Sequence, residues 1–216
     1  MKTRFAGLFL VAVGLASAQA PQLPADVDSV SYSRLPLLTR DKMTPEQTRV
    51  MDKIAGKDRA TPPLGPQNTS MYSPGAAEPI DALNQYLRKT VVGSRYFEMC
   101  ALIGAWEFDQ TYEWSAHEGG AQRAGVEQSV IDAIKFNRDL KDLAEKDAAV
   151  IQFGRDLFRG RHRTSPATYA KVVELFGQQG MIELATIMGD YGMAAILLNA
   201  AGQELPPDRK PLLPAR

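Results

Sequence analysis

Apolar positions recur at helical spacing from about residue 80 to residue 200, and no segment shows the strict alternation of a half-buried strand. Ser165 followed by Pro166 is a typical helix start, and glycines at 177 and 180 predict a break in the helix that follows. The pattern therefore predicts an all-α protein. We expect helices at about 79–92, 94–107, 109–124, 127–137, 145–160 and 166–199.

The segment from Met181 to Ala201 is apolar on nearly every side, and Glu183 and Asp190 are its only charges. A transmembrane span is one interpretation, but an aspartate at its centre would cost about 2.5–3.5 kcal/mol. We favour a helix in the core or at a subunit interface, because a helix that is apolar all round must be covered by protein.

Prolines mark the borders of the helical region. Nine of the 14 prolines lie between Pro21 and Pro79, four lie between Pro206 and Pro214, and only Pro166 lies between these groups. Proline lacks the backbone N–H and interrupts helices. We therefore predict an irregular Pro-rich N-terminal arm at 19–79, one helical domain at 80–200 and a Pro-rich tail at 201–216.

One short helix is expected inside the arm. Thr44 can cap it, Pro45 suits its first turn, Gln47 completes a capping box and Gly56 ends it. Asn68 begins the pattern Asn-Thr-Ser, which fits an N-glycosylation acceptor in an exposed loop.

The N-terminus has the pattern of a secretory signal peptide. Lys2 and Arg4 precede an apolar run from Phe5 to Ala16, and small residues follow. Cleavage after Ala18 is favoured over Ala20, because Pro21 would adjoin the second site. The apolar run of about a dozen residues is too short to span ~30 Å of hydrocarbon. We therefore predict a signal peptide at 1–18 and a secreted or periplasmic protein.

The charge of the mature chain argues against two classes of partner. Without Lys2 and Arg4 the chain has 23 basic and 25 acidic residues, with no basic stripe or cluster. We expect no nucleic acid and no membrane as a partner. Cys100 is the single cysteine, so an internal disulfide is excluded and stability must come from burial and from oligomerisation.

The candidate chemistry lies in a stretch rich in aromatic residues from Arg95 to His117. His117 is one of two histidines, and Glu113 precedes it by four residues. In a helix this spacing places both side chains on one face, about 6 Å apart along the axis. A carboxylate beside an imidazole can act as a general acid/base pair near neutral pH. The alternative is a solvated Glu–His pair on a helix surface.

This stretch resembles the carboxymuconolactone decarboxylase and alkylhydroperoxidase D-like family. Peroxidase members have a Glu, then Cys-x-x-Cys, then a His four residues after the second Cys, with 19 residues from Glu to His. Glu98 and His117 are also 19 residues apart, but Gln110 and Glu113 occupy the two cysteine positions. The resemblance covers about residues 80–200 and, weakly, 35–56. It implies an alkylhydroperoxidase D-like helical bundle that assembles as a homo-oligomer, a trimer or hexamer.

The missing thiols make dithiol peroxidase and other alkylhydroperoxidase-type antioxidant activity the least favoured functions. The decarboxylase branch implies a lyase that decarboxylates or isomerises a small carboxylate or lactone. In it, His117 would be the acid/base, Glu113 would orient and charge it, and Glu98 would be a second acid or a supporting partner. The alternative is a non-catalytic protein for small-molecule binding or assembly on the same fold, so catalysis itself stays open.

Three further residues are candidate substrate contacts. Gln110 could donate a hydrogen bond to a substrate oxygen. Tyr112 and Trp114 could line an apolar pocket, although aromatic residues at helical spacing are also typical of plain core.

Neither a metal nor a cofactor is expected. A zinc site normally has three protein ligands, and no further His or Cys accompanies Glu113 and His117, although Glu98 could complete a set.

A single site requires a sharp reversal of the chain. In one straight helix Glu98 and His117 would lie about 28 Å apart. We therefore predict two antiparallel helices that turn at Glu107–Asp109, with Asp109 as the N-cap of the second.

Overall fold

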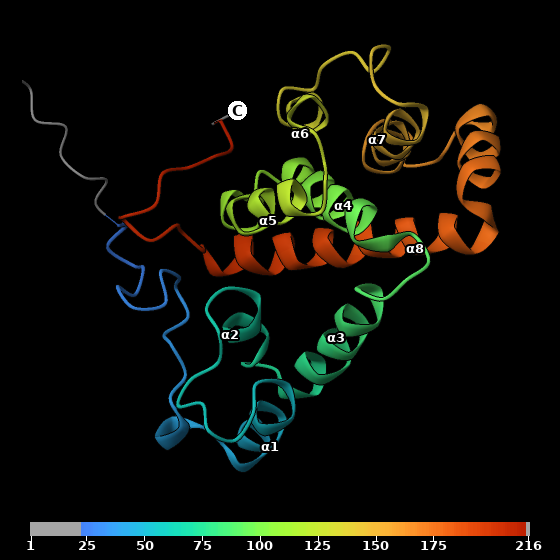
Figure 1. The fold of residues 1–216 in the computed structure, drawn as a ribbon. Coiled ribbons are helices and arrows are strands. Elements are labelled where there is room, and N and C mark those ends of the chain that lie inside the picture. Colours follow the sequence, from blue (N-terminus) through green and yellow to red (C-terminus); the bar gives the residue numbers. More distant parts are fainter. Residues whose placement is uncertain (1–22, 215–216) are drawn as a thin grey trace, which may run out of the picture.

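The computed structural model describes residues 23–214, and this part of the chain is helical without any strand (Figure 1). The predicted signal peptide and its cleavage site lie outside the described residues. The elements are a 3-10 helix η1 (Arg40–Lys42) and the helices α1 (Pro45–Ile54), α2 (Pro66–Ser70), α3 (Pro74–Leu87), α4 (Gly93–Glu107), α5 (Thr111–Arg123), α6 (Gln128–Lys135), α7 (Glu145–Phe158) and α8 (Pro166–Ala201). The all-α prediction is confirmed.

Helix α4 is the centre of the main core. Every residue from Met99 to Trp106 is buried, and the helix packs against α5, α6, α7 and α8. Gly104 permits the contact with α8, since a Cβ there would lie 2.9 Å from the Cβ of Tyr191. This close approach brings α8 beside the part of α4 that carries Glu98.

Helix α8 starts as its sequence predicts. The Ser165 side chain accepts a hydrogen bond from the Thr168 N–H at 3.0 Å, and Pro166 occupies the first turn. The helix is broken at Gly177, whose φ of 70° lies in the left-handed region that favours glycine, whereas Gly180 is in the helix.

Helix α8 is also, by length and composition, the single helix in residues 23–214 that could cross a membrane. Half of its most apolar stretch is buried within the protein, against helices on both sides. In Figure 1, α1–α3 lie below it and α4–α7 lie above it.

The N-terminal arm contains more helix than its prolines predict. Helix α1 has the expected capping box of Thr44 and Gln47. The short helix α2 was not predicted, and α3 begins at Pro74, five residues before the expected start. Pro79 is the sixth residue of α3, where it lacks the N–H that would bond to the carbonyl of Gly75. A proline this near the helix start does not stop the helix.

The arm has a small core of its own, formed by Leu38, Val50, Met51, Met71 and Ala77, and it contacts the rest of the protein through α2 and α3 against α8. Asn68 is part of this packing and is only 2% exposed. Its side-chain oxygen accepts a hydrogen bond from the Leu38 N–H at 3.1 Å. The interpretation of Asn68 as an exposed glycosylation acceptor is therefore wrong, because its amide is used to fold the arm.

The reversal between α4 and α5 occurs where the sequence placed it, with one correction. Asp109 has a φ of 52°, and Gln110, not Asp109, is the N-cap of α5. The Gln110 side chain accepts a hydrogen bond from the Tyr112 N–H at 2.8 Å. The backbone N–H of Gln110 also donates to the Ala105 carbonyl at 2.9 Å, which closes the turn. The two helices then run antiparallel.

Candidate active site

Glu98 on α4 and His117 on α5 meet across this hairpin. The distance between Glu98 Oε2 and His117 Nδ1 is 2.8 Å, and both side chains are largely buried. Gly120 makes room for the contact, since a Cβ at that position would lie within 2.9–3.0 Å of the Glu98 carboxylate. The structure thus brings together two of the predicted residues that a single straight helix would separate.

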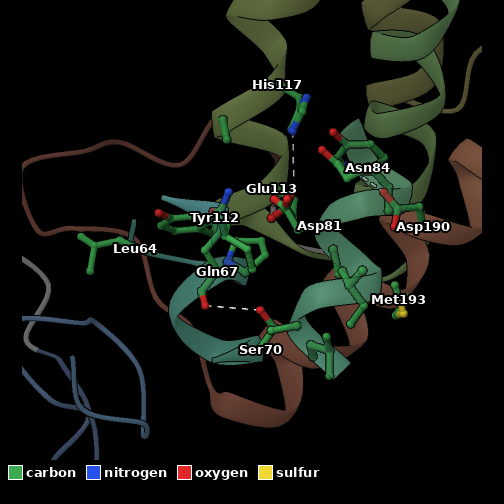
Figure 2. Close-up of a pocket in the computed structure, with 18 of the residues that line it drawn as sticks. Leu64, Gln67, Ser70, Asp81, Asn84, Tyr112, Glu113, His117, Asp190 and Met193 are labelled. Carbon is green, nitrogen blue, oxygen red and sulfur yellow. Dashed lines mark hydrogen bonds and ion pairs between the residues drawn. The ribbon is translucent and has the colours of Figure 1, made fainter. Parts of the chain in front are cut away.

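Glu113 approaches the other nitrogen of the same imidazole. Its Oε2 lies 3.6 Å from His117 Nε2, and its side chain is 4% exposed (Figure 2). Burial raises the pKa of the Glu113 carboxyl, with the neighbouring His117 opposing the shift. The three groups therefore form a row, with Glu98 behind the imidazole and Glu113 in front of it.

Tyr191 of α8 completes the surroundings of the histidine. Its ring lies edge-on to His117 with the ring centres 4.7 Å apart, and edge-on to Phe97 at 5.5 Å. Burial raises the pKa of the Tyr191 hydroxyl, which therefore stays neutral near pH 7. Tyr191 could not be recognised as a site residue from the sequence, because nothing distinguishes it from the other apolar positions of α8.

A cavity of about 220 Å³ opens in front of Glu113 and His117, between the arm and helices α3, α5 and α8 (Figure 2). Tyr112 lines it and packs against Gly65 of the arm, where a Cβ would lie 2.5 Å from the tyrosine ring. Glu98 is not part of the wall. The cavity has an apolar portion and a polar one. Its apolar lining includes Ile54, Leu64, Ala77, Ile80, Met193 and Leu197; its polar lining includes Asp81, Asn84, Arg88 and Asp190.

A polar network joins α3 to α8 on one side of the cavity. Asn84 donates a hydrogen bond to Asp190 Oδ2 at 2.8 Å, as Figure 2 shows, and accepts one from Arg88 Nε at 3.0 Å. Burial raises the pKa of Asp190, and the amide of Asn84 and the charge of Arg88 oppose the shift. Nothing in the sequence marks these three residues as part of one site, because only the packing of α3 against α8 brings Asn84 and Arg88 to Asp190.

Gln110 and Trp114 have structural partners outside this cavity. Gln110 is 3% exposed, caps α5, and donates from Nε2 to Asn199 Oδ1 at 2.7 Å. Trp114 is fully buried, and its indole N–H donates to Glu118 Oε2 at 2.5 Å. Of the three predicted substrate contacts, Tyr112 alone lines the cavity. The helical repeat of α5 explains this difference, because residues 112, 113, 116 and 117 share the face toward the cavity and residues 110 and 114 do not.

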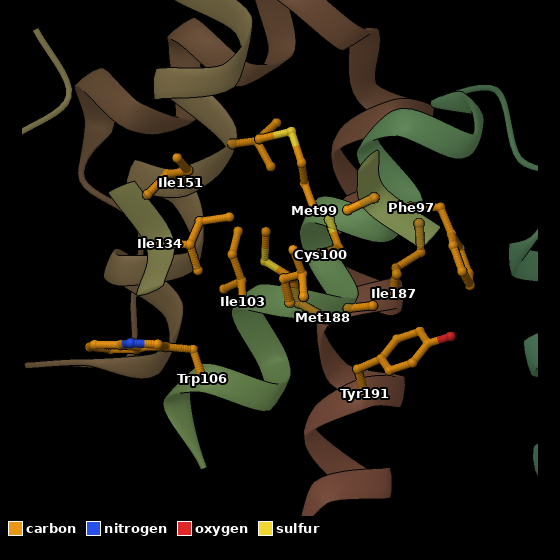
Figure 3. Close-up of a cluster of buried hydrophobic side chains, with 14 of the residues drawn as sticks. Phe97, Met99, Cys100, Ile103, Trp106, Ile134, Ile151, Ile187, Met188 and Tyr191 are labelled. Atoms are coloured by element: carbon orange, nitrogen blue, oxygen red, sulfur yellow. The ribbon is translucent and has the colours of Figure 1, made fainter. Parts of the chain in front are cut away.

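The only thiol is buried in the main core rather than exposed to the cavity. Figure 3 shows Cys100 among Met99, Ile103 and Met188. Burial raises the pKa of this thiol, so the reactive thiolate is disfavoured. Within residues 23–214, no three or more His, Cys, Asp or Glu side chains are grouped so that they could hold a metal ion.

Comparisons with known proteins bear on the fold. No protein-family model matches the sequence, and neither does any curated protein. Among solved structures, a protein of unknown function from Agrobacterium tumefaciens, described as a putative antioxidant defence protein AhpD, superposes with a TM-score of 0.58 at 12% identity. The match covers 63% of this chain and 94% of that one. This chain has the alkylhydroperoxidase D-like fold.

The debrominase Bmp8 shares the alkylhydroperoxidase D-like fold with this chain. Its structure in complex with 2,3,4-tribromopyrrole superposes with a TM-score of 0.57 at 17% identity, over 83% of this chain and 96% of Bmp8. Its apo structure gives the same TM-score and identity over 79% and 91%. At these identities the likeness confirms the fold that the Glu98–His117 spacing suggested, and the chemistry must be argued from the site.

Proposed function

We propose that this protein is a cofactor-free acid/base enzyme, a lyase that decarboxylates or isomerises a small carboxylate or lactone. The observation that supports the proposal is the row of Glu98, His117 and Glu113, which ends at a buried carboxyl group in the wall of a cavity. A buried carboxyl group with a raised pKa is suited to give and take protons near neutral pH.

Each member of the row has a distinct task in the proposal. Glu98 accepts a hydrogen bond from the Nδ1–H of His117, which fixes the tautomer and leaves Nε2 directed at Glu113. His117 relays the proton, and Glu113 exchanges it with the substrate. The gap of 3.6 Å between His117 and Glu113 exceeds a hydrogen bond, and such contacts commonly shorten when substrate binds. This assignment reverses the sequence-based one, in which Glu113 oriented the histidine.

Decarboxylation illustrates the chemistry. The bond between the substrate's α-carbon and its carboxylate breaks, carbon dioxide leaves, and the electron pair moves into the adjacent carbonyl as an enolate. Glu113 then delivers its proton to the α-carbon. His117 takes up a proton from water at Nε2 and passes it to Glu113, so each turnover consumes one proton from solvent. Isomerisation uses the same groups, with Glu113 removing a proton from one carbon and delivering it to another.

The apolar walls and the volume of the cavity support a small ring or chain compound as the substrate. The debrominase of the same fold, crystallised with a tribrominated pyrrole, supports the same size class.

Proton exchange in D₂O, followed by NMR over a panel of small lactones and unsaturated acids, tests the proposal. Wild-type protein should incorporate deuterium next to the carbonyl or release carbon dioxide from at least one compound. Glu113→Gln and His117→Ala should abolish the reaction. His162→Ala is the matched control, because His162 is exposed and lies outside the cavity. No exchange with any compound, or equal exchange in Glu113→Gln, would contradict the proposal.

The second candidate is a non-catalytic binding protein on the same fold. The distance of 3.6 Å between Glu113 and His117 favours this candidate, because a protein that only binds its ligand does not need to pass a proton between the two side chains. Binding of a panel compound without deuterium incorporation would support this candidate over the enzyme.

Export and assembly are also proposed. The signal-like pattern of residues 1–18 supports a secreted or periplasmic protein. A homo-oligomer, a trimer or hexamer, is supported by Ile182 and Ile196 of α8, which are 59% and 51% exposed and two heptads apart on one helix face. Sedimentation velocity of the mature protein tests the assembly, and a monomer at micromolar concentration would contradict it.

A further inference from the structure

Arg88 is the one permanently positive side chain that lines the cavity in the described part of the chain. It follows directly after α3, which ends at Leu87, and it remains exposed to solvent. An incoming ligand therefore meets this guanidinium on its way to Glu113 and His117.

The protein holds the guanidinium in position without neutralising it. Arg88 donates from Nε to Asn84 Oδ1 at 3.0 Å and from Nη2 to the Tyr191 hydroxyl at 3.4 Å. Its central carbon lies 4.9 Å from the centre of the Phe97 ring, which it covers.

Arg95 of α4 has a different environment from Arg88. Arg95 is paired with both Asp147 and Glu127, whereas no carboxylate of residues 23–214 forms an ion pair with Arg88. A guanidinium has five N–H donors, and Arg88 uses two of them in these contacts. The remaining donors can bind a carboxylate with two parallel hydrogen bonds.

We propose that Arg88 binds a non-reacting carboxylate of a small ligand, and holds the rest of that ligand against the apolar wall with its reacting end toward Glu113 and His117. This inference deepens the proposed function and rests on it for the reaction, since it names the substrate class that the site would take. Ile80, Met193 and Leu197 supply the apolar wall.

The acidic side chains of the cavity are the main objection, because they would repel an anion. Asp81, Glu113 and Asp190 all line it. Burial raises the pKa of Glu113 and of Asp190, which favours their neutral forms and weakens their repulsion of an anion. The alternative ligand is an ammonium compound, which the acidic side chains would attract and Arg88 would repel.

Isothermal titration calorimetry with three probes of one shape separates these cases: benzoate, its neutral amide benzamide, and benzylamine. Full-length mature protein should bind benzoate at least about tenfold more tightly than benzamide. Arg88→Gln should lose this preference, while its affinity for benzamide stays within about twofold and so shows that the cavity is intact. Lys89→Gln is the matched control, because it removes the same charge one position away from the cavity wall. Its preference for benzoate should be unchanged.

The inference is overturned if wild-type protein does not prefer benzoate to benzamide, if Arg88→Gln keeps the preference, or if benzylamine binds more tightly than benzoate. The proposed function is tested by a different measurement, proton exchange, so the two proposals can fail independently. Glu113→Gln should stop proton exchange and still prefer benzoate. Benzoate binding that depends on Arg88 without any proton exchange would remove the enzyme and keep the carboxylate site.

Discussion

Glu98 and His117 are 19 residues apart in the sequence and 2.8 Å apart in the structure. Their contact sets the orientation of the imidazole, because it engages Nδ1 and leaves Nε2 for Glu113. In peroxidases that resemble this chain, a cysteine stands where Glu113 stands here. The same fold thus presents a carboxyl group to the imidazole where those peroxidases have a thiol.

Glu98→Gln should lower the rate of proton exchange by about ten- to a hundredfold, which is less than the complete loss expected for His117→Ala. The amide keeps the size of the side chain but no longer supports the charged imidazole. NMR exchange rates with the best compound of the panel measure this. Equal rates in Glu98→Gln and wild type would show that the 2.8 Å contact has no part in the reaction.

Gly120→Ala should destabilise the fold by up to about 2 kcal/mol, because the new methyl group displaces the Glu98 carboxylate from its contact with His117, and the lost hydrogen bond outweighs the gain in helix propensity. Gly189→Ala is the control, since a Cβ there meets no atom within 4 Å. Alanine is the better helix former, so Gly189→Ala should stabilise by about 0.5–1 kcal/mol. Urea unfolding measures the change in the free energy of unfolding for both variants. If Gly120→Ala is as stable as wild type, the hairpin accommodates the added methyl group.

The stability of Glu113→Gln relative to wild type should depend on pH. The pKa of Glu113 is raised above its ordinary value of 4.5 in the folded protein. The protonated Glu113 carboxyl therefore contributes fully to the stability of the fold below pH 4.5. This contribution is lost as pH rises through the pKa of Glu113 in the folded protein. Glu113→Gln should gain on wild type as pH rises from about 4 to 8. Urea unfolding across this range checks the trend, with Glu46→Gln on the surface of α1 as the control. A difference that is constant with pH would contradict the raised pKa.

Dithiol-dependent peroxidase activity should be absent. Gln110 and Glu113 stand at the two cysteine positions of the motif, and Cys100 is buried with a raised pKa. Cumene hydroperoxide with dithiothreitol should be consumed at the same background rate by wild type and Cys100→Ser. Turnover that Cys100→Ser abolishes would overturn this prediction.

The mature protein should begin at Gln19. Lys2, Arg4 and the apolar run after them favour export, and Ala18 offers the better cleavage site because Pro21 adjoins the alternative. N-terminal sequencing of protein recovered outside the cytoplasm measures the start directly. A chain that keeps Met1 would contradict export by this route.

The sequence alone determined those features that depend on neighbouring residues. Thr44 and Ser165 cap α1 and α8 as predicted, and Gly177 breaks α8. The approach of Glu113 to His117 belongs to the same class, since a spacing of four residues in a helix fixes it. Caps, breaks and spacings of this kind are set by local hydrogen bonds and sterics, which a short stretch of sequence contains.

Only the tertiary structure decided which distant groups share the site. No glycine or proline marks the reversal at Asp109, and the packing of α4 against both α5 and α8 holds it there. Arg88 and Tyr191 reach the cavity from the C-terminal end of α3 and from α8, while Gln110 and Trp114 are turned away from it. The physical reason is that these positions follow from the burial of the whole core, a sum over contacts between residues far apart in the chain, which no single segment encodes.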